Sequence, residues 1–210
     1  MSGMGSMIRM LSILILLSSC GNLPIAYLQN FSSVNNVVFG FPEYEITEEI
    51  YDDFDNSFMK IRFGRGPHAI LILAYTKDGV YEWVGADDVK IFTLNGRIIK
   101  TSGLPSNFEI IKPLEKVYYP NQVFEGINLF DPDLFSATLE RSMKIDTATI
   151  TKLENAIEVS RIQENFSLDI IGWKGVNTYY QNPSSNLIEA SEQMIHPRLP
   201  VAKVEFYFKY

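Results

Sequence analysis

The chain has 210 residues, of which 46% are hydrophobic and 20% are charged, and its formal net charge is −7. This length is sufficient for one domain with a packed core. The acidic balance argues against nucleic acid and against electrostatic docking on anionic lipid, because both require clustered lysine and arginine. A single cysteine rules out an internal disulfide.

The N-terminal segment has the pattern of an export signal that ends in a lipobox. Arg9 is the basic flank, and the apolar run Leu11 to Leu17 is far shorter than the roughly 20 residues of a membrane-spanning helix. Leu17-Ser18-Ser19-Cys20 places small residues before a cut and a thiol after it. We expect residues 1–19 to be removed as a lipoprotein signal peptide. Cys20 then carries a covalent diacylglycerol and an N-acyl chain, and we expect no other cofactor. The alternative is a buried thiol in a short N-terminal helix.

The residues after the lipobox predict a tether followed by one folded domain. Gly21 stands where an aspartate would favour inner-membrane retention, so outer-membrane sorting is favoured. Residues 20–36 are small and polar and are assigned to the tether, and residues 37–210 to a single β-rich periplasmic domain. Thr47 followed by Glu48 and Glu49 predicts an N-capped short helix near residues 47–55.

Five consecutive antiparallel strands are predicted between Phe58 and Thr101. The run Ala69 to Tyr75 is apolar at successive positions, which predicts a central strand covered on both faces. Asp78-Gly79 and Asn95-Gly96 predict tight hairpin turns, because these residues tolerate positive φ. The predicted strands are 58–63, 69–75, 80–84, 89–94 and 97–101.

The second half of the chain continues this pattern more weakly. Leu104 to Phe135 contains four prolines and is predicted to be a long connection with short or edge strands. Leu134 to Lys144 is interpreted as a strand, and turns are expected at Lys174-Gly175 and around residues 182–185. Further predicted strands are 157–162, 168–173, 176–180, 187–193 and 201–210. The fold class is therefore mainly β, an antiparallel meander sheet closing toward a barrel or sandwich, with one short helix near residues 47–55.

Two motifs resemble the YjbF lipoprotein family, also called the GfcB or YmcC family. The first is GPHAILILAYTKDGVYEWVGADDVKIFTLNGRIIKTSGL, Gly66 to Leu104, and the second is QMIHPRLP, Gln193 to Pro200. The resemblance implies an outer-membrane lipoprotein that faces the periplasm and is encoded beside machinery for exopolysaccharide or group 4 capsule production. It supplies no catalytic residues.

Catalytic and metal-ligating residues are not predicted. The only histidines, His68 and His196, lie far apart in the sequence, and a zinc site would have to recruit carboxylates from elsewhere. His196 before Pro197 is interpreted as a structural corner rather than as an acid or base, with a contact to a ligand or partner as the alternative. Arg97 is interpreted as a solvated hairpin arginine, with a binding role as the alternative.

Aromatic side chains are the remaining candidates for contact with a ligand or partner. Trp83, Trp173, Tyr179 and Tyr180 could stack on sugar rings, although alternating aromatic residues in strands are more often part of a core.

These observations lead to one favoured function and two alternatives. The favoured function is a noncatalytic accessory or binding module in exopolysaccharide or capsule assembly or export, anchored to the outer membrane by lipid. Its partners would be the polysaccharide secretion machinery or a glycan. One alternative is a glycan-modifying enzyme that uses a carboxylate pair from Asp87-Asp88 or Asp131-Pro132-Asp133. The other is a lipid or acyl-chain carrier with a dry half-barrel cavity near Ile70 to Leu73.

Overall fold

The computed structural model describes residues 41–116 and 118–209. The predicted signal peptide 1–19, the lipid attachment residue Cys20 and the tether 20–36 lie outside this range. Residues Glu43 to Tyr210 form one compact unit. Among the described residues, no helix is long and apolar enough to cross a membrane.

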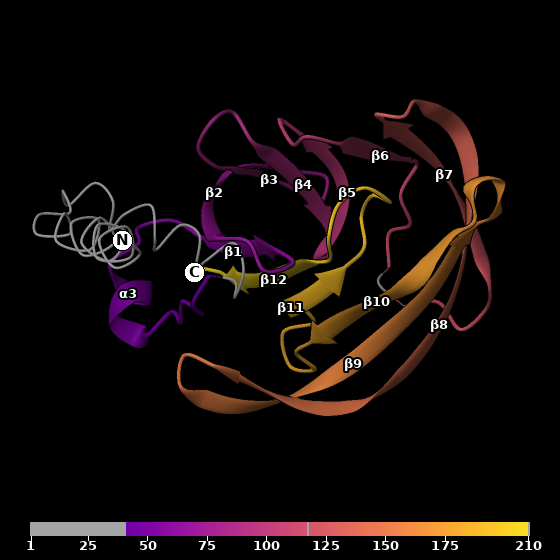
Figure 1. The fold of residues 1–210 in the computed structure, drawn as a ribbon. Helices are drawn as coiled ribbons and strands as arrows, with labels where there is room; N and C mark the ends of the chain where they lie inside the picture. The colour runs from indigo at the N-terminus through magenta and orange to yellow at the C-terminus, as the bar shows by residue number, and fades with distance from the viewer. Residues whose placement is uncertain (1–40, 117, 210) are drawn as a thin grey trace, which may run out of the picture. The chain divides into compact units, whose positions relative to one another are not determined.

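Twelve antiparallel strands in this unit close into a barrel, so of the two predicted architectures the barrel is confirmed (Figure 1). Each strand pairs with its neighbours in the sequence, and the barrel is closed by β1 and β12, where Phe58 lies opposite Tyr207. The strands are β1 (Phe58–Phe63), β2 (His68–Lys77), β3 (Val80–Val84), β4 (Lys90–Leu94), β5 (Arg97–Ser102), β6 (Asn107–Ile111), β7 (Val123–Phe130), β8 (Leu134–Lys152), β9 (Asn155–Leu168), β10 (Trp173–Gln181), β11 (Ile188–Gln193) and β12 (Ala202–Tyr207).

The first five strands and both of their tight turns are confirmed. Asp78 and Gly79 have φ values of 52° and 79°, and Asn95 and Gly96 have values of 49° and 72°. Two successive residues with positive φ are characteristic of the type I′ turn, whose twist matches that of the flanking strands. The sequence signal at both turns is purely local, which is why it predicts these hairpins correctly.

The expectation that residues 69–75 are covered on both faces is wrong. Within β2 only Leu71 is fully buried, while Tyr75 is 59% exposed. Alternate residues of a barrel strand face outward, and this outer face is covered only near Ile70 and Ile72, which pack against a second apolar cluster.

The stretch from Leu104 to Phe135 contains a short strand as predicted, but it is not a long connection. It contains β6 and β7, and β7 pairs with β6 on one side and with β8 on the other. The four prolines lie outside these strands, at positions 105, 113, 120 and 132. They mark the ends of the strands, where no ladder hydrogen bond is lost, instead of converting the strands into edges. Leu134 to Lys144 is a strand as predicted, although β8 continues to Lys152.

The predicted strand 168–173 and the predicted turn at Lys174-Gly175 are wrong. Residues Asp169–Ile171 form a 3-10 turn that ends at Gly172 with φ 64°, and Lys174 and Gly175 lie inside β10. Gly175 lies close to other side chains instead, because a Cβ atom there would lie 2.4 Å from Met194 Sδ and would displace that side chain. The turn around residues 182–185 is confirmed between β10 and β11.

The predicted short helix is α3 (Glu48–Asp52), which is shorter than the expected range of 47–55. Its N-cap is Thr47, whose Oγ1 accepts a hydrogen bond from the Ile50 N–H at 3.3 Å. Beside it, Ile46, Phe58 and Tyr207 form the second apolar cluster, outside the barrel wall. The main core fills the barrel with large side chains, among them Trp83, Ile91 and Phe206.

Candidate functional site: a charged network inside the barrel

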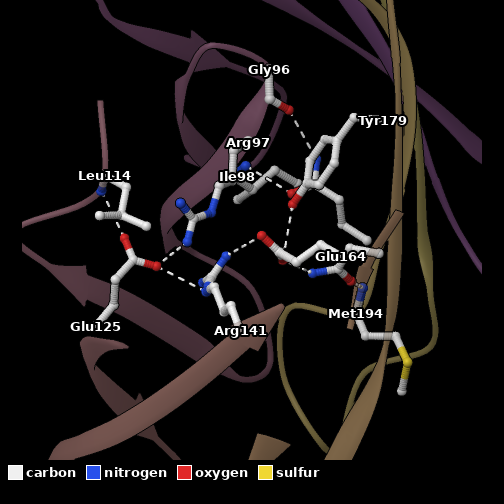
Figure 2. Close-up of polar contacts among 11 residues, drawn as sticks. Gly96, Arg97, Ile98, Leu114, Glu125, Arg141, Glu164, Tyr179 and Met194 are labelled. Atoms are coloured by element: carbon white, nitrogen blue, oxygen red, sulfur yellow. Dashed lines mark hydrogen bonds and ion pairs between the residues drawn. The ribbon is translucent and has the colours of Figure 1, made fainter. Parts of the chain in front are cut away.

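Charged and polar side chains from five strands meet inside the barrel (Figure 2). Arg97 comes from β5, Glu125 from β7, Arg141 from β8, Glu164 from β9 and Tyr179 from β10. Each is at most 5% exposed. Buried charges are costly unless they are paired and hydrogen-bonded, so their contacts decide what the site can do.

The two arginines and two glutamates alternate along the network. Arg97 Nη2 donates to Glu125 Oε2, and Arg141 Nε lies 2.8 Å from the same oxygen. Arg141 Nη1 donates to Glu164 Oε2 at 2.7 Å. The second oxygen of Glu125 accepts a hydrogen bond from the backbone N–H of Leu114 at 2.7 Å. Two cations therefore balance two anions within a single connected cluster.

Neutral groups donate further hydrogen bonds to the carboxylate of Glu164. Its Oε1 accepts a hydrogen bond from Asn177 Nδ2 at 2.8 Å and a longer one from the Tyr179 hydroxyl at 3.4 Å. Asn177 Oδ1 in turn accepts a hydrogen bond from the backbone N–H of Met194 at 2.7 Å. These contacts hold the carboxylate and extend the network to the start of the β11–β12 connection.

Gln193 joins β11 to the hairpin between β4 and β5. Its Oε1 accepts a hydrogen bond from the Ile98 N–H at 2.9 Å, and its Nε2 donates to the Gly96 carbonyl at 2.9 Å. These two contacts link strands that are not sheet neighbours, so they brace the barrel across its interior.

The pKa directions agree with fixed charges at this site. Burial opposes ionisation of Glu164, yet Arg141 and Arg97 together with the hydrogen bond from Asn177 hold its pKa below the ordinary value. Burial also opposes the charge on Arg97, but Glu164, Tyr179 and Glu125 raise its pKa. The pKa of Tyr179 is raised, chiefly by burial and by the charge of Glu164. Glu164 and Arg97 are therefore both charged at neutral pH, and the tyrosine remains protonated.

A cavity of about 20 Å³ adjoins the network and is lined in part by Arg97, Trp173 and Gln193. A volume of this size holds one water molecule and excludes a sugar ring or an acyl chain. The Nε and Nη1 atoms of Arg97 and the Nε1 atom of Trp173 are buried without a protein partner. The interior is thus packed and charge-paired rather than open to a substrate.

The structure brings together three of the residues singled out in the sequence. Arg97 and Tyr179 belong to the network, and Trp173 lines the adjoining cavity while packing edge-on against Phe166 at 4.7 Å between ring centroids. The interpretation of Arg97 as a solvated hairpin arginine is wrong, because its side chain points into the barrel and is 4% exposed. Its position directly after a turn gives no indication of which face it occupies.

The other three residues lie elsewhere. Trp83 is fully buried in the main core, and its Nε1 donates to Thr93 Oγ1 at 2.8 Å. Tyr180 is half-buried, on the opposite face of β10 from Tyr179. His196 is buried, and its Nδ1 accepts a hydrogen bond from the Arg198 N–H at 3.1 Å, as expected for a structural corner.

Glu125, Arg141 and Glu164 were not identified from the sequence. Each stands at a position that alternates with apolar residues of the inward face, as Glu164 does between Ile162 and Phe166. A charged residue on an otherwise apolar face of a strand is the signal that could have found them. The ion-pair partners of these residues could not have been found this way, because the partners come from other strands.

One of the carboxylates considered for glycosidase chemistry is paired with an arginine. Asp131 pairs with Arg198 at 2.7 Å on the surface. Within residues 41–116 and 118–209, no group of three or more histidine, aspartate or glutamate side chains is placed to hold a metal ion.

The fold and the site define a closed antiparallel barrel with a packed, charge-balanced interior. Comparison with known proteins places this barrel in a family. The family model described as "Group 4 capsule polysaccharide lipoprotein gfcB, YjbF" matches residues 31–206. The chain therefore belongs to the YjbF family, as its sequence motifs indicated.

Two relatives from Escherichia coli K12 agree with this assignment. The uncharacterized lipoprotein YjbF is 21% identical over 149 residues, which cover 70% of this chain and 60% of the relative. The crystal structure of the hypothetical lipoprotein YmcC has a TM-score of 0.69 at 19% identity and covers 85% of this chain and 95% of that one. At 19% identity, the similarity to YmcC establishes that the two chains share a fold.

Proposed function

We propose that the protein is a periplasm-facing outer-membrane lipoprotein that acts as a noncatalytic accessory or binding module in the assembly or export of an exopolysaccharide or capsule. The observation that carries this proposal is the match of residues 31–206 to a family described as a group 4 capsule polysaccharide lipoprotein. The printed names of both relatives also describe lipoproteins.

The lipid anchor rests on Cys20 at the end of the lipobox Leu17-Ser18-Ser19-Cys20. An acidic chain with a net charge of −7 has no electrostatic means of staying on an anionic membrane, so the acyl chains must provide the attachment. Several acyl chains anchor a protein far more firmly than one, because each buried methylene contributes about 0.8 kcal/mol. Gly21 favours sorting to the outer membrane.

The noncatalytic role is supported by the way the buried charges are used. Glu125 and Glu164 are both held by arginines, and the adjoining cavity of about 20 Å³ cannot admit a substrate. The same packing argues against an acyl-chain carrier, which needs an open interior. Contacts with the secretion machinery or a glycan are therefore assigned to the outer surface of the barrel.

The proposal is tested in a bacterium that makes the polysaccharide and lacks the gene for this protein. The full chain should restore the amount of cell-associated polysaccharide. The same chain exported behind a conventional signal peptide, without Cys20, should accumulate in the periplasm and fail to restore it. Full restoration by this unanchored form would contradict the need for an anchor, and normal polysaccharide in the deletion strain would contradict the accessory role.

A further inference from the structure

The long hairpin of β8 and β9 leaves one edge of the sheet unpaired. β7 pairs with β8 only as far as Arg141, whereas β9 stays paired with β8 to the Lys152–Asn155 pair (Figure 1). Within the described part of the chain, β8 from Ser142 to Lys152 therefore has a partner strand on one side only. Such an edge presents unpaired backbone N–H and C=O groups to another strand.

The direction of these backbone groups follows from the turn. Leu153 and Glu154, with φ values of 47° and 62°, form a two-residue turn, so Lys152 and Asn155 are a hydrogen-bonded pair. Even-numbered residues of β8 then bond to β9, and the odd-numbered ones point their backbone groups away from it. The outward-pointing residues are Met143, Ile145, Thr147, Thr149 and Thr151.

This edge carries three charged side chains but lacks proline and bulges, two other features that normally block edge pairing. Residues 142–152 contain no proline, their ladder with β9 has no bulge, and the segment is rich in β-branched residues. Thr147, Thr149 and Thr151 are exposed, and Ile145 is 47% exposed. The edge can therefore accept an additional strand.

The side chains along the edge complement a second copy of the same edge. In an antiparallel pairing with Thr149 at the two-fold axis, Thr147 lies opposite Thr151, and the ladder ends at Lys152 because Leu153 and Glu154 form the turn. The turn residue Glu154 then lies beyond the last pair, at the end of the hairpin that approaches Lys144 of the other copy. Lys144 and Glu154 are both exposed. Asp146 lies opposite Lys152, although both already have ion-pair partners within the chain.

The neighbouring registers are less favourable. Centring the pairing on Ala148 places Lys144 opposite Lys152, and centring it on Ile150 brings Asp146 toward the turn residue Glu154. Like charges directly opposite each other destabilise a strand pair. Centring on Thr147 pairs no opposite charges. The sequence of the edge thus favours one two-fold register over those beside it.

We propose that two copies of this chain associate through the unpaired edges of β8, antiparallel and centred on Thr149, so that the sheet continues from one barrel into the next. The isologous geometry closes at two copies, since each copy uses its free edge once. The occupant of this edge is a second copy of the same chain.

A single cysteine at the axis tests the proposal in the full chain within cell envelopes. Opposed Cα atoms of a hydrogen-bonded antiparallel pair lie about 5.5 Å apart, which is within the range that a disulfide spans. Thr149→Cys should therefore form a disulfide-linked dimer on non-reducing gels after addition of a mild oxidant, to which the two thiols lose two electrons and two protons. The unsubstituted chain, which keeps Cys20, provides the baseline.

Glu158→Cys is the matched control, because Glu158 pairs with Thr149 on the neighbouring strand of the same hairpin. In the proposed dimer the two copies of residue 158 lie three strand spacings apart, about 14 Å, which is too far for a disulfide. Equal cross-linking of the two variants would show random collision and overturn the proposal. Absence of a dimer with Thr149→Cys would also overturn it.

Charge reversal provides a second test of the register. In the Thr149→Cys background, Lys144→Glu or Glu154→Lys alone should reduce the yield of cross-linked dimer several-fold, because each brings like charges together where the two copies meet. The two reversals together should restore the yield. A double reversal that behaves no better than the single ones would contradict the proposed register.

Discussion

The substitution Glu164→Gln should destabilise the barrel strongly. The side chain of Glu164 is fully buried and balances one of two buried arginines, with a hydrogen bond of 2.7 Å from Arg141. Glutamine keeps the shape but removes the charge, which leaves two guanidinium groups with Glu125 as their only counterion. Removing one partner of a buried ion pair typically costs about 3 to 5 kcal/mol. Against a total stability of roughly 5 to 15 kcal/mol, this is a large fraction.

Urea unfolding followed by tryptophan fluorescence measures this change. In thermal unfolding of a domain of this size, the same loss of about 3 to 5 kcal/mol corresponds to a fall in Tm of roughly 6 to 20 °C. Glu109→Gln is a suitable control, because Glu109 pairs with Lys100 on the surface at 3.0 Å. Loss of this exposed pair should change stability by less than about 1 kcal/mol.

A double substitution separates charge balance from packing. Arg141→Leu combined with Glu164→Leu removes one cation and one anion and leaves Arg97 paired with Glu125. It should therefore be less destabilising than Glu164→Gln, because no unbalanced charge remains buried. If Glu164→Gln costs less than about 1 kcal/mol, or if the double variant is the less stable one, the assigned role of the network is incorrect.

The pH dependence of stability and two further substitutions test the network and the packing around it. Folding lowers the pKa of Glu164, so the stabilisation by its charge is complete above the unfolded pKa of about 4.3 and is lost as the pH falls through the folded pKa. The difference in unfolding free energy between the wild type and Glu164→Gln, measured by urea unfolding across this pH range, should therefore become smaller in acid. A difference that does not change with pH would contradict this. Trp83→Ala should cost about 3 to 5 kcal/mol by the same assay, because its side chain is fully buried, and an unchanged unfolding midpoint would place Trp83 outside the core. Gly96→Ala should lower Tm more than Gly172→Ala. Both glycines have positive φ, but of the two new Cβ atoms only the one at position 96 would clash, at 2.3 Å from Ile188 Cβ. Equal losses of Tm in calorimetry would show that the structure relieves the clash.

Features that depend on neighbouring residues were predictable from the sequence. The turns at Asp78-Gly79 and Asn95-Gly96 and the Thr47 cap each rest on two to four adjacent residues, and the structure confirms them. The same local reasoning fails at Lys174-Gly175. There the glycine lies inside a strand, against the side chain of Met194, which is distant in the sequence.

The charged network could not be predicted because it depends on long-range contacts. Arg97 and Glu125 are 28 residues apart, and Arg141 and Glu164 are 23 residues apart. The alternation of residues along a strand indicates which face a residue occupies, but it does not indicate which strands will bring opposite charges together. Closure of the barrel sets those partners, and it depends on the pairing of β1 with β12.

The proposed anchor at Cys20 is tested most directly by the intact mass of the protein purified from cell envelopes. We predict a polypeptide that begins at Cys20 and carries the added mass of a diacylglycerol and an N-linked acyl chain. A chain with an unmodified Cys20, or one that retains residues 1–19, would contradict the proposed attachment to the membrane.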